Sequence, residues 1–375
     1  MKILIDASNI KTGGGVQVAL SVIHELEENY TDQFRFHYLV SDAVFQQLSI
    51  CDLKVTCLTA SISSLAPFSK VRRTIEKLAL NHDLTFTVFG PPFWYANKKN
   101  KHLIGFANAW LLNSDSCAYK KFSVSKRVIT KLKNFILLKL LYRQHSYYVT
   151  ETEVMKNLFL RKFKGYNKDV FVVPNGLSYI YEKGIERYKP VISDKYDEHF
   201  KLITITHNYP HKNLNILVEV SKLLVQEGRK FIFFVTFPPD EYNKMSDDFK
   251  NYTVNLGVVN ITDCPSYYEN VDALFLPTLI ECFSVSYLEA MYHRLPILTS
   301  DLDFARAVCG DAALFFDPFD PVSIKNRIIQ VMDSRCLQSE LVERGLVTLQ
   351  KYPMNSDKVS SYIKIISEIL GINYV

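Results

Sequence analysis

The sequence predicts an α/β protein with two doubly wound domains, each built on a parallel sheet with helices on both faces. Residues 2–8 form a buried apolar run, which a glycine-rich loop and an amphipathic helical pattern follow. The same order of apolar run, polar loop and helical pattern recurs from residue 201. A buried strand that leads through a loop into a helix is the opening unit of a doubly wound domain. The chain of 375 residues also exceeds one typical core, so two domains are expected.

The composition is that of an ordinary soluble globular protein. Hydrophobic residues make up 48% of the chain and charged residues 22%, and the formal net charge is +5. The seven cysteines are scattered and contain no Cys-x-x-Cys pair, which indicates reduced thiols in a cytosolic setting rather than disulfides or a zinc site. No apolar run reaches the roughly 18 residues that a membrane-spanning helix needs. Disordered, disulfide-rich and transmembrane classes are therefore excluded.

The first half of the chain alternates apolar runs with helical patterns. The helix after the glycine loop has its apolar residues on one face, as expected for packing against a sheet. These residues are Val16, Ala19, Leu20, Ile23 and Leu26. Further strands are expected at 34–40, 53–58, 84–89, 102–110 (a strand and its loop), 147–150 and 170–173.

A strongly basic stretch interrupts this alternation. No acidic residue lies between Ser116 and Thr150, and apolar residues are interleaved with the basic ones. A basic amphipathic helix is typical of a surface that lies on anionic lipid, but a core helix with a basic polar side fits equally well, and one long helix can do both. Nucleic acid is not expected, because no aromatic platform or binding motif accompanies the charge. The basic residues are Lys120, Lys121, Lys126, Arg127, Lys131, Lys133, Lys139 and Arg143.

The second half repeats the strand–helix pattern after a polar linker at 181–200. Strands are expected at 201–206, 231–236, 254–259, 273–276 and 295–300, and helices at 214–224, 324–332 and 359–370. The last helix is expected to return to the first domain. The predicted domains are therefore residues 1–174 and 175–355, with 356–375 packing back on the first.

One strand–loop–helix unit of the second half carries two carboxylates. Its helix is expected to begin near Ser284, with Glu281 just before it and Glu289 inside it. Unpaired amides and the positive end of the helix dipole favour an anion near Phe283, Ser284 and Val285. Carboxylates on either side of a bound phosphate can accept hydrogen bonds from hydroxyls. The unit therefore predicts a nucleotide-sugar site, and a plain capped helix is the alternative.

The two carboxylates also carry a resemblance to a known family. Glu281 and Glu289, with Leu276-Pro277-Thr278 before them and residues 295–300 after them, resemble the E-x7-E motif of the retaining glycosyltransferases of the GT-B fold, in particular the GT4-like family (glycosyl transferases group 1). The resemblance covers most of the chain and is strongest over 201–318. It implies two facing Rossmann-like domains with a cleft between them, the N-terminal one on the acceptor side and the C-terminal one binding a nucleotide sugar. It further implies transfer of a hexosyl unit with retention of anomeric configuration, without a bound metal or other cofactor.

The resemblance implies roles for particular residues. Glu281 and Lys212 match the catalytic positions, where Glu281 holds sugar hydroxyls and Lys212 stabilises the donor diphosphate. Glu289 matches the position that binds the ribose. The other donor-binding positions lie in loops near the diphosphate or the base, and they are Gly13, Gly14, Gly15, His207, Asn208, Val258, Val259, Phe283, Ser284 and Val285.

The chain departs from the family pattern in three places. Ser284 stands where glycine is usual, and His207 stands where a diphosphate-binding arginine is usual. Ala107-Asn108 stands where many relatives carry a His-Asp pair, so Asn108 and Trp110 are the candidates for the acceptor side. A histidine cannot supply the permanent bidentate charge of arginine, so the contact at 207 is altered.

These departures keep two other functions open. A catalytically silent partner subunit would bind the donor weakly, and a nucleotide-sugar epimerase would share the fold. Asp301-Leu302-Asp303 imitates a metal-binding motif of another glycosyltransferase class, but it falls at a strand-to-helix connection and is expected to be a loop.

The basic stretch and the resemblance together suggest the acceptor. We expect a sugar acceptor, lipid-linked, used in bacterial surface-polysaccharide or O-antigen synthesis. The anionic membrane surface would be met through residues 120–143, and the protein would be cytoplasmic or peripheral on the inner face of the cytoplasmic membrane.

Overall fold

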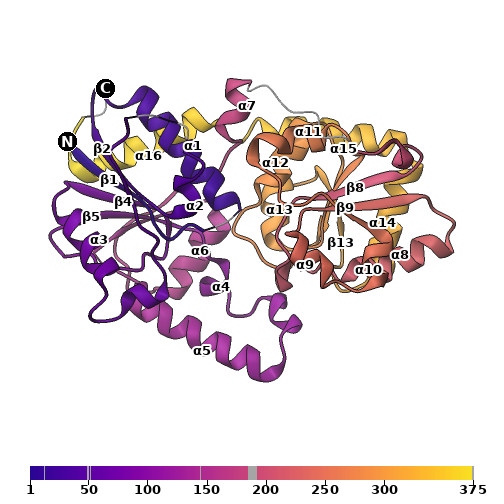
Figure 1. Cartoon of the computed structure of the whole chain (residues 1–375), viewed down its shortest axis with the longest axis horizontal. Coiled ribbons are helices and arrows are strands. Elements are labelled where there is room, and N and C mark those ends of the chain that lie inside the picture. The colour runs from indigo at the N-terminus through magenta and orange to yellow at the C-terminus, as the bar shows by residue number, and fades with distance from the viewer. Residues whose placement is uncertain (12, 49, 51, 144, 185–191, 374–375) are drawn as a thin grey trace. The chain divides into compact units, whose positions relative to one another are not determined.

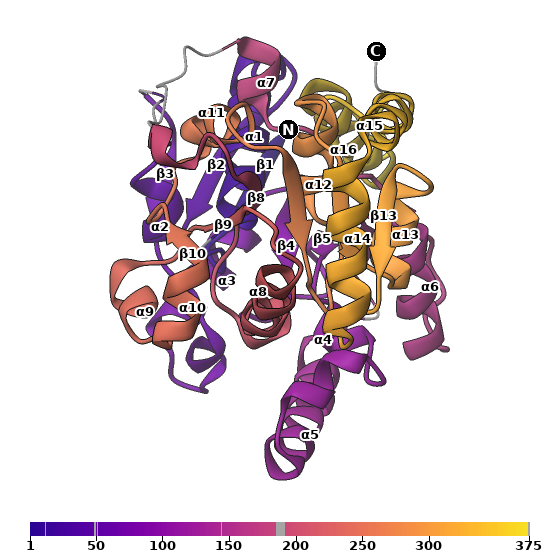
Figure 2. The same ribbon diagram turned by 90° about the vertical axis from the view of Figure 1, so that its right-hand side faces the viewer.

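The computed structural model describes every residue except 12, 49, 51, 144, 185–191 and 374–375 (Figure 1). The chain divides into two compact units. The first comprises Met1–Ser114, Val124–Lys183 and Pro353–Val375, and the second comprises Asp115–Ser123 and Gly184–Tyr352. Each unit is a parallel sheet with helices on both faces, as Figures 1 and 2 show. The expectation of two doubly wound α/β domains is therefore confirmed.

The first unit contains a seven-stranded parallel sheet. Its strands are β1 (Lys2–Ala7), β2 (Arg35–Val40), β3 (Val55–Cys57), β4 (Leu84–Gly90), β5 (Lys101–Phe106), β6 (Tyr147–Thr150) and β7 (Val170–Val172), in the order β3-β2-β1-β4-β5-β6-β7. Its helices are α1 (Gly14–Asn29), α2 (Asp42–Phe45), α3 (Lys70–Leu80), α4 (Ala109–Leu112), α5 (Val124–Leu141), α6 (Glu153–Lys162), α7 (Tyr179–Lys183) and α16 (Asn355–Leu370). Ile3 and Ile5 of β1 join the core formed with α1 and α16, whereas Leu4 joins Ile75 of α3 on the other face. The alternation of side chains along β1 thus places helices on both faces.

The second unit contains a six-stranded parallel sheet. Its strands are β8 (Phe200–Thr204), β9 (Phe231–Val235), β10 (Thr253–Asn255), β11 (Ala273–Leu276), β12 (Ile297–Ser300) and β13 (Ala313–Phe316), in the order β10-β9-β8-β11-β12-β13. Its helices are α8 (Ile216–Gln226), α9 (Pro239–Asn243), α10 (Asp247–Tyr252), α11 (Cys264–Tyr268), α12 (Val285–Tyr292), α13 (Asp303–Cys309), α14 (Pro321–Asp333) and α15 (Arg335–Leu349). Phe275 of β11 and Phe233 of β9 lie in one core with Leu217 of α8 and Ile328 of α14.

The unit boundaries differ from the expected 174/175 and 355/356. The first unit extends to Lys183, because the ring of Tyr179 stacks on His24 of α1 at 4.4 Å. It resumes at Pro353, where the chain meets Gly176 so closely that a Cβ there would lie 2.1 Å from the Pro353 carbonyl oxygen. The expected linker 181–200 is only partly a linker: it starts inside α7, and its residues 185–191 lie outside the described residues.

The basic stretch is largely helical, and the structure shows which part of α5 packs against the rest of the first unit. Leu138 and Leu141 at the end of α5 are buried, whereas most apolar side chains before them are exposed, for example Ile129 at 66%. The helix therefore joins the core only at its C-terminal end. Among the described residues, no helix combines the length and the apolar content needed to cross a membrane.

A buried polar network lies beneath the loop after β4. The carboxylate of Asp6 accepts hydrogen bonds from the Trp94 indole (2.7 Å), the Thr87 hydroxyl (3.2 Å) and both the amide and the hydroxyl of Ser8. Burial raises the pKa of Asp6, and the four donors oppose that rise. His102 Nε2 lies 2.8 Å from the Thr87 hydroxyl oxygen, and its ring packs on Trp94 with centroids 4.8 Å apart. Since Thr87 donates to Asp6, its oxygen accepts from His102, which must therefore carry its proton on Nε2.

We expect His102 to make the protein acid-sensitive. Burial lowers the pKa of His102 from 6.5 to about 3, and Nδ1 has no hydrogen-bond partner among the described residues. Between pH 6.5 and pH 3, His102 is protonated in the unfolded chain but stays neutral in the folded chain. The free energy of unfolding therefore falls by about 1.4 kcal/mol for each pH unit in this range. The midpoint of urea unfolding should fall between pH 7.0 and pH 5.5, and His102→Asn should weaken that fall. An equal fall in His102→Asn and in wild type would contradict the assignment, and His145→Asn, at an exposed position, is the control.

Candidate functional site

The candidate site lies where the strand order of the second sheet reverses. β8 and β11 are neighbours in the middle of that sheet, but their following connections run to opposite sides of it. In open parallel sheets, ligands bind outside the carboxyl ends of the strands at such a switch point. The loop after β8 carries Lys212, and the loop after β11 carries Glu281. The topology therefore brings together two residues that the chain separates widely.

Lys212 is held by the conformation of its own loop. It ends a short 3₁₀-helix (Pro210–Lys212), and the next residue, Asn213, has a left-handed backbone with φ 58°. Asparagine tolerates this conformation better than most residues. The buried Asn213 side chain donates to the carbonyl oxygen of Pro318 at 2.7 Å, which ties the loop to the segment after β13. Asn213 is thus a positioning residue for Lys212.

Lys212 and Glu281 form a direct, largely buried ion pair. The ammonium of Lys212 donates to Glu281 Oε1, and the exposed fractions of the two side chains are 17% and 16%. The Thr278 hydroxyl donates to the same oxygen at 3.0 Å. The Leu279 amide also donates to the His211 carbonyl oxygen at 2.8 Å, so the two loops are joined through their backbones as well. A largely buried pair of this kind is an electrostatic site that a phosphate and a hydroxyl can share.

The histidines of the Lys212 loop add no positive charge near pH 7. The pKa of His211 is lowered to about 4, mainly by burial; Glu281 opposes this shift and Lys212 adds to it. Burial also lowers the pKa of His207, which stands at the family's arginine position. A neutral imidazole can exchange a hydrogen bond with a phosphate oxygen but brings no permanent charge. Lys212 is consequently the cation of this loop at neutral pH.

The start of α12 supplies backbone amides beside the ion pair. Ser284 is its N-cap residue, and no side chain caps the helix there. The amides of the first turn are therefore available to an anion from Phe283 to Val285. Inside the helix, Glu289 is only 4% exposed and accepts a hydrogen bond from the buried Tyr268 hydroxyl at 3.0 Å. Tyr268 thus orients the carboxylate that is expected to bind the ribose.

Removing the Tyr268 hydroxyl is expected to lower both the thermal stability of the protein and its affinity for a nucleotide. Tyr268 is completely buried, and burial with the nearby Glu289 raises the pKa of its phenol. Tyr268→Phe deletes a hydrogen bond to a carboxylate, which is worth about 1.5–3 kcal/mol. We expect a lower Tm and a smaller stabilisation of the protein by added nucleoside diphosphate, both measured by differential scanning fluorimetry. Tyr292→Phe on the exposed side of α12 is the matched control, and equal behaviour of the two variants would exclude this role.

The other predicted donor residues are divided between the two units. Val258 (64% exposed) and Val259 follow β10, where Gly257 has a positive φ of 76°. Asn208 lies in the loop after β8, and its side-chain nitrogen contacts Met245 Sδ at 3.3 Å. These three residues therefore lie beyond the carboxyl ends of strands in the second sheet.

The glycine loop and the acceptor-side residues belong to the first unit. Gly13, with φ 65°, precedes α1, and Gly14 and Gly15 are the first residues of that helix. Asn108 is the N-cap of α4, because its side chain accepts from the Leu111 amide at 3.2 Å. Trp110 is half-buried in α4. Each of these residues follows a strand of the first sheet at its carboxyl end, β1 for the glycines and β5 for Asn108 and Trp110.

Sequence reasoning missed a segment that reaches the candidate site. Residues 115–123 group with the second unit although their chain neighbours on both sides belong to the first. Cys117 Sγ lies 3.7 Å from the Leu279 carbonyl oxygen, and Lys120 Nζ lies 4.9 Å from the centre of the Phe319 ring. The run of basic residues concealed this segment, because it appeared continuous with the helix after it. In the Asp301-Leu302-Asp303 run, which imitates a metal-binding motif, Asp301 forms an ion pair with Arg306. The described residues contain no cluster of side chains that could hold a metal ion.

Comparisons with known proteins show what the sequence and the fold resemble. Residues 200–334 match the family model of the Glycosyl transferases group 1. O-antigen chain mannosyltransferase B of Escherichia coli is 26% identical over 153 residues, and this match spans only 38% of the present chain and 39% of that protein. The solved structure of WaaG, a glycosyltransferase involved in lipopolysaccharide biosynthesis, has 12% identity and a TM-score of 0.68, over 98% of this chain and 100% of that one. Anabaena HepE in complex with UDP-glucose has 15% identity and a TM-score of 0.68, also over 98% and 100%.

Proposed function

We propose that this chain transfers a hexosyl unit from a nucleotide sugar to a sugar acceptor. The proposal is supported by the match of residues 200–334 to the Glycosyl transferases group 1 model and by a fold shared with solved glycosyltransferases. The observation that carries the proposal is the pairing of Lys212 with Glu281 at the switch point of the second sheet. This site offers a cation, a carboxylate and helix amides within one loop system. These are the groups that a sugar diphosphate needs.

The proposed reaction follows from the charge that develops on the donor. The bond between the anomeric carbon and the diphosphate oxygen breaks, and the anomeric carbon bonds to the acceptor oxygen. Lys212 and the amides around Ser284 stabilise the negative charge that grows on the leaving diphosphate. Glu281 accepts hydrogen bonds from the sugar hydroxyls and holds the ring in place. The leaving diphosphate oxygen takes the acceptor proton on the same face, so the anomeric configuration is retained.

The proposed acceptor is a lipid-linked sugar at the inner face of the cytoplasmic membrane, in a pathway of surface-polysaccharide or O-antigen synthesis. The mannosyltransferase and WaaG, by their names, act in O-antigen and lipopolysaccharide synthesis, which supports this class of acceptor. The HepE complex with UDP-glucose supports a nucleotide sugar as donor. The alternatives are a catalytically silent partner subunit or a nucleotide-sugar epimerase. The intact Lys212–Glu281 pair favours an active transferase over a silent subunit.

Release of nucleoside diphosphate from UDP-, GDP- and dTDP-sugars tests the proposal, with Glu281→Ala measured alongside. We expect release from one donor in wild type and little release in the variant. The anomeric configuration of the product, read by NMR, tests retention. Release from no donor, together with no thermal stabilisation by any nucleotide, would favour the silent subunit. Conversion of a donor into its epimer without release of nucleoside diphosphate would favour the epimerase.

A further inference from the structure

Helix α5 presents an apolar surface that the rest of the first unit leaves uncovered. Figures 1 and 2 show the helix projecting from that unit past α4. Among the side chains of α5 that the structure describes, six apolar ones are about half exposed or more, which is unusual because large apolar residues normally pack in a core. They are Val124 (75%), Val128 (60%), Ile129 (66%), Leu132 (59%), Phe135 (51%) and Ile136 (49%).

These six residues form one stripe on the helix. At about 100° of rotation for each residue, positions 124, 128, 132, 135 and 136 fall on one side, with 129 at its border. The exposed lysines at 131 and 133 flank the stripe on opposite sides. The half-buried Thr130 and Asn134 lie on the other side of the helix, with the buried Leu138 and Leu141. The helix therefore has an apolar side, basic borders and an inner side.

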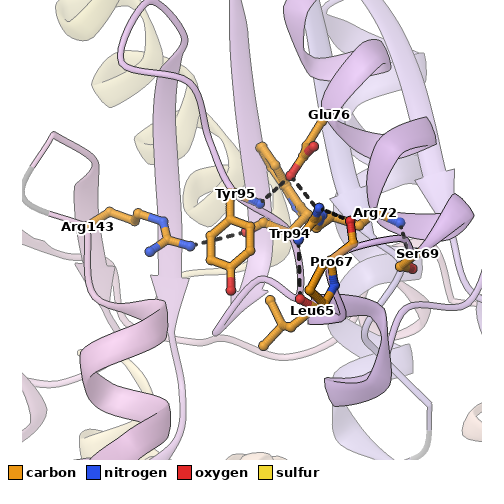
Figure 3. Close-up of polar contacts among 8 residues, drawn as sticks. All are labelled: Leu65, Pro67, Ser69, Arg72, Glu76, Trp94, Tyr95 and Arg143. Carbon is orange, nitrogen blue, oxygen red and sulfur yellow. Dashed lines mark hydrogen bonds and ion pairs between the residues drawn. The ribbon is translucent and has the colours of Figure 1, made fainter.

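The inner side fixes the direction in which the stripe points. The Asn134 side chain donates to the Trp110 carbonyl oxygen in α4 at 3.1 Å. Just after the helix, the Arg143 guanidinium lies 4.7 Å from the centre of the Tyr95 ring and donates to the Trp94 carbonyl oxygen at 3.4 Å, as Figure 3 shows.

Tyr95 is itself held in place by its neighbours. Its amide donates to Glu76 at 3.2 Å, and Arg72 lies 5.3 Å from the centre of its ring (Figure 3). Arg72 also pairs with Glu76 at 3.4 Å and donates to the Pro67 carbonyl oxygen at 2.6 Å. The segment just after α5 is thus attached to a cluster on α3 and on the loop after β4, and these contacts hold the stripe on the side away from the rest of the first unit.

We propose that α5 is a membrane-binding helix that lies in the plane of an anionic bilayer, with this stripe in the acyl region and the bordering lysines at the phosphate groups. Exposed apolar residues between basic borders are the pattern of interfacial helices. The absence of acidic residues from Ser116 to Thr150 complements the negative charge of a cytoplasmic leaflet. A protein partner or a second copy would need only the apolar stripe, whereas the anionic surface accounts for both the stripe and its borders.

The position of α5 also relates it to the acceptor. Asn134 of the helix donates a hydrogen bond to the backbone carbonyl of Trp110, an acceptor-side candidate in the same unit. A helix that lies on the membrane there keeps the acceptor-side residues at the surface from which a lipid-linked sugar is taken. This last step rests on the proposed function, but membrane binding by α5 does not.

Vesicle sedimentation tests the inference with two matched pairs of variants. Full-length protein is expected to bind vesicles of phosphatidylethanolamine and phosphatidylglycerol but not vesicles of phosphatidylcholine. Leu132→Ser/Phe135→Ser should lower binding at least tenfold. Val225→Ser/Val347→Ser, which removes two similarly exposed apolar side chains (52% and 59%) from the second unit, should leave it unchanged. Equal binding by both double variants, or equal binding to both kinds of vesicle, would overturn the proposal.

The basic borders are tested separately. Lys131→Gln/Lys133→Gln should weaken binding to anionic vesicles by about fivefold for each lysine, and added salt should weaken wild-type binding. Lys164→Gln/Lys244→Gln, at exposed positions outside α5, is the control. Salt-independent binding, or equal losses in both pairs, would contradict an anionic surface.

A second readout keeps the test valid if the serine variant unfolds. In Leu132→Trp, the emission of the added indole should shift to shorter wavelength with anionic vesicles only. An absent shift would overturn the proposal. A dimer in solution that Leu132→Ser/Phe135→Ser dissociates would show instead that a second copy covers the stripe. Release of nucleoside diphosphate with a short soluble acceptor should be unchanged in the α5 variants. Loss of the catalytic function is thereby distinguished from loss of membrane binding.

Discussion

Replacing Lys212 by alanine is expected to lower kcat by about 10²–10³-fold, which is the usual effect of deleting one preorganised group that stabilises developing negative charge. The ammonium lies in a largely buried site and bonds to Glu281. Its effect should be larger in the transition state than in the bound substrate, because charge grows on the diphosphate as the sugar leaves. KM for the donor should therefore change less than kcat.

Two further variants separate this role from a general loss of charge or stability. Lys222→Ala removes an exposed lysine of the same unit that pairs with Asp248, and it should keep wild-type activity. Lys212→Arg keeps the positive charge and should retain more activity than Lys212→Ala. Activity in Lys212→Ala within a few-fold of wild type would mean that Lys212 is only a structural partner of Glu281.

Replacing Gly176 by alanine is expected to destabilise the first unit by about 2–3 kcal/mol or more. An added Cβ would lie 2.1 Å from the Pro353 carbonyl oxygen and 3.1 Å from its carbon, so one of the two backbone segments must move. Pro353 leads into α16, where the Asn355 side chain donates to the Ser21 carbonyl oxygen at 2.9 Å. Displacing Pro353 therefore disturbs the contacts between α16 and α1.

The shift of the urea midpoint measures this effect. Gly165→Ala is the control, because a Cβ at that glycine would meet no atom within 4 Å. If Gly176→Ala were as stable as the control, the Pro353 backbone would be able to move away from the added Cβ with little loss of stability. The structure gives the reason for the glycine at position 176, which is the close approach of the distant Pro353 segment.

The two sheets could be predicted from the sequence because their strands are short buried runs that loops and amphipathic helices follow. β1 and β8 begin near the expected residues, and Ser284 is the N-cap of α12 as expected. The edges of the units could not be predicted in the same way. The stacking of Tyr179 on His24 and the return of the chain at Pro353 depend on contacts between segments far apart in the sequence.

The candidate site was predictable as a list of residues but not as an arrangement. Lys212 and Glu281 were identified separately, whereas their ion pair depends on β8 and β11 being neighbours. Asn213 is a positioning residue only because of its left-handed backbone and its bond to Pro318. The hydrogen bond from Tyr268 to Glu289 joins residues 21 positions apart, and no sequence motif indicates it.

The basic helix shows why patterning alone left two interpretations open. The same apolar residues serve equally well in a core and at a membrane, and only their exposure distinguishes the two. Leu138 and Leu141 pack inward, while Val128 and Leu132 do not. The sequence predicts an amphipathic helix, and the neighbouring elements decide which part of it stays uncovered.

Calorimetric titration of UDP, GDP and dTDP tests the central claim most directly, because it requires neither the acceptor nor turnover. That claim is that the switch point of the second sheet binds a nucleoside diphosphate through Lys212, the start of α12 and Glu289. We predict that one nucleotide binds wild type with 1:1 stoichiometry, and that Lys212→Ala and Glu289→Ala each weaken it at least tenfold, while Lys222→Ala binds normally. Failure of all three nucleotides to bind a folded protein, or wild-type affinity in both Lys212→Ala and Glu289→Ala, would contradict the account.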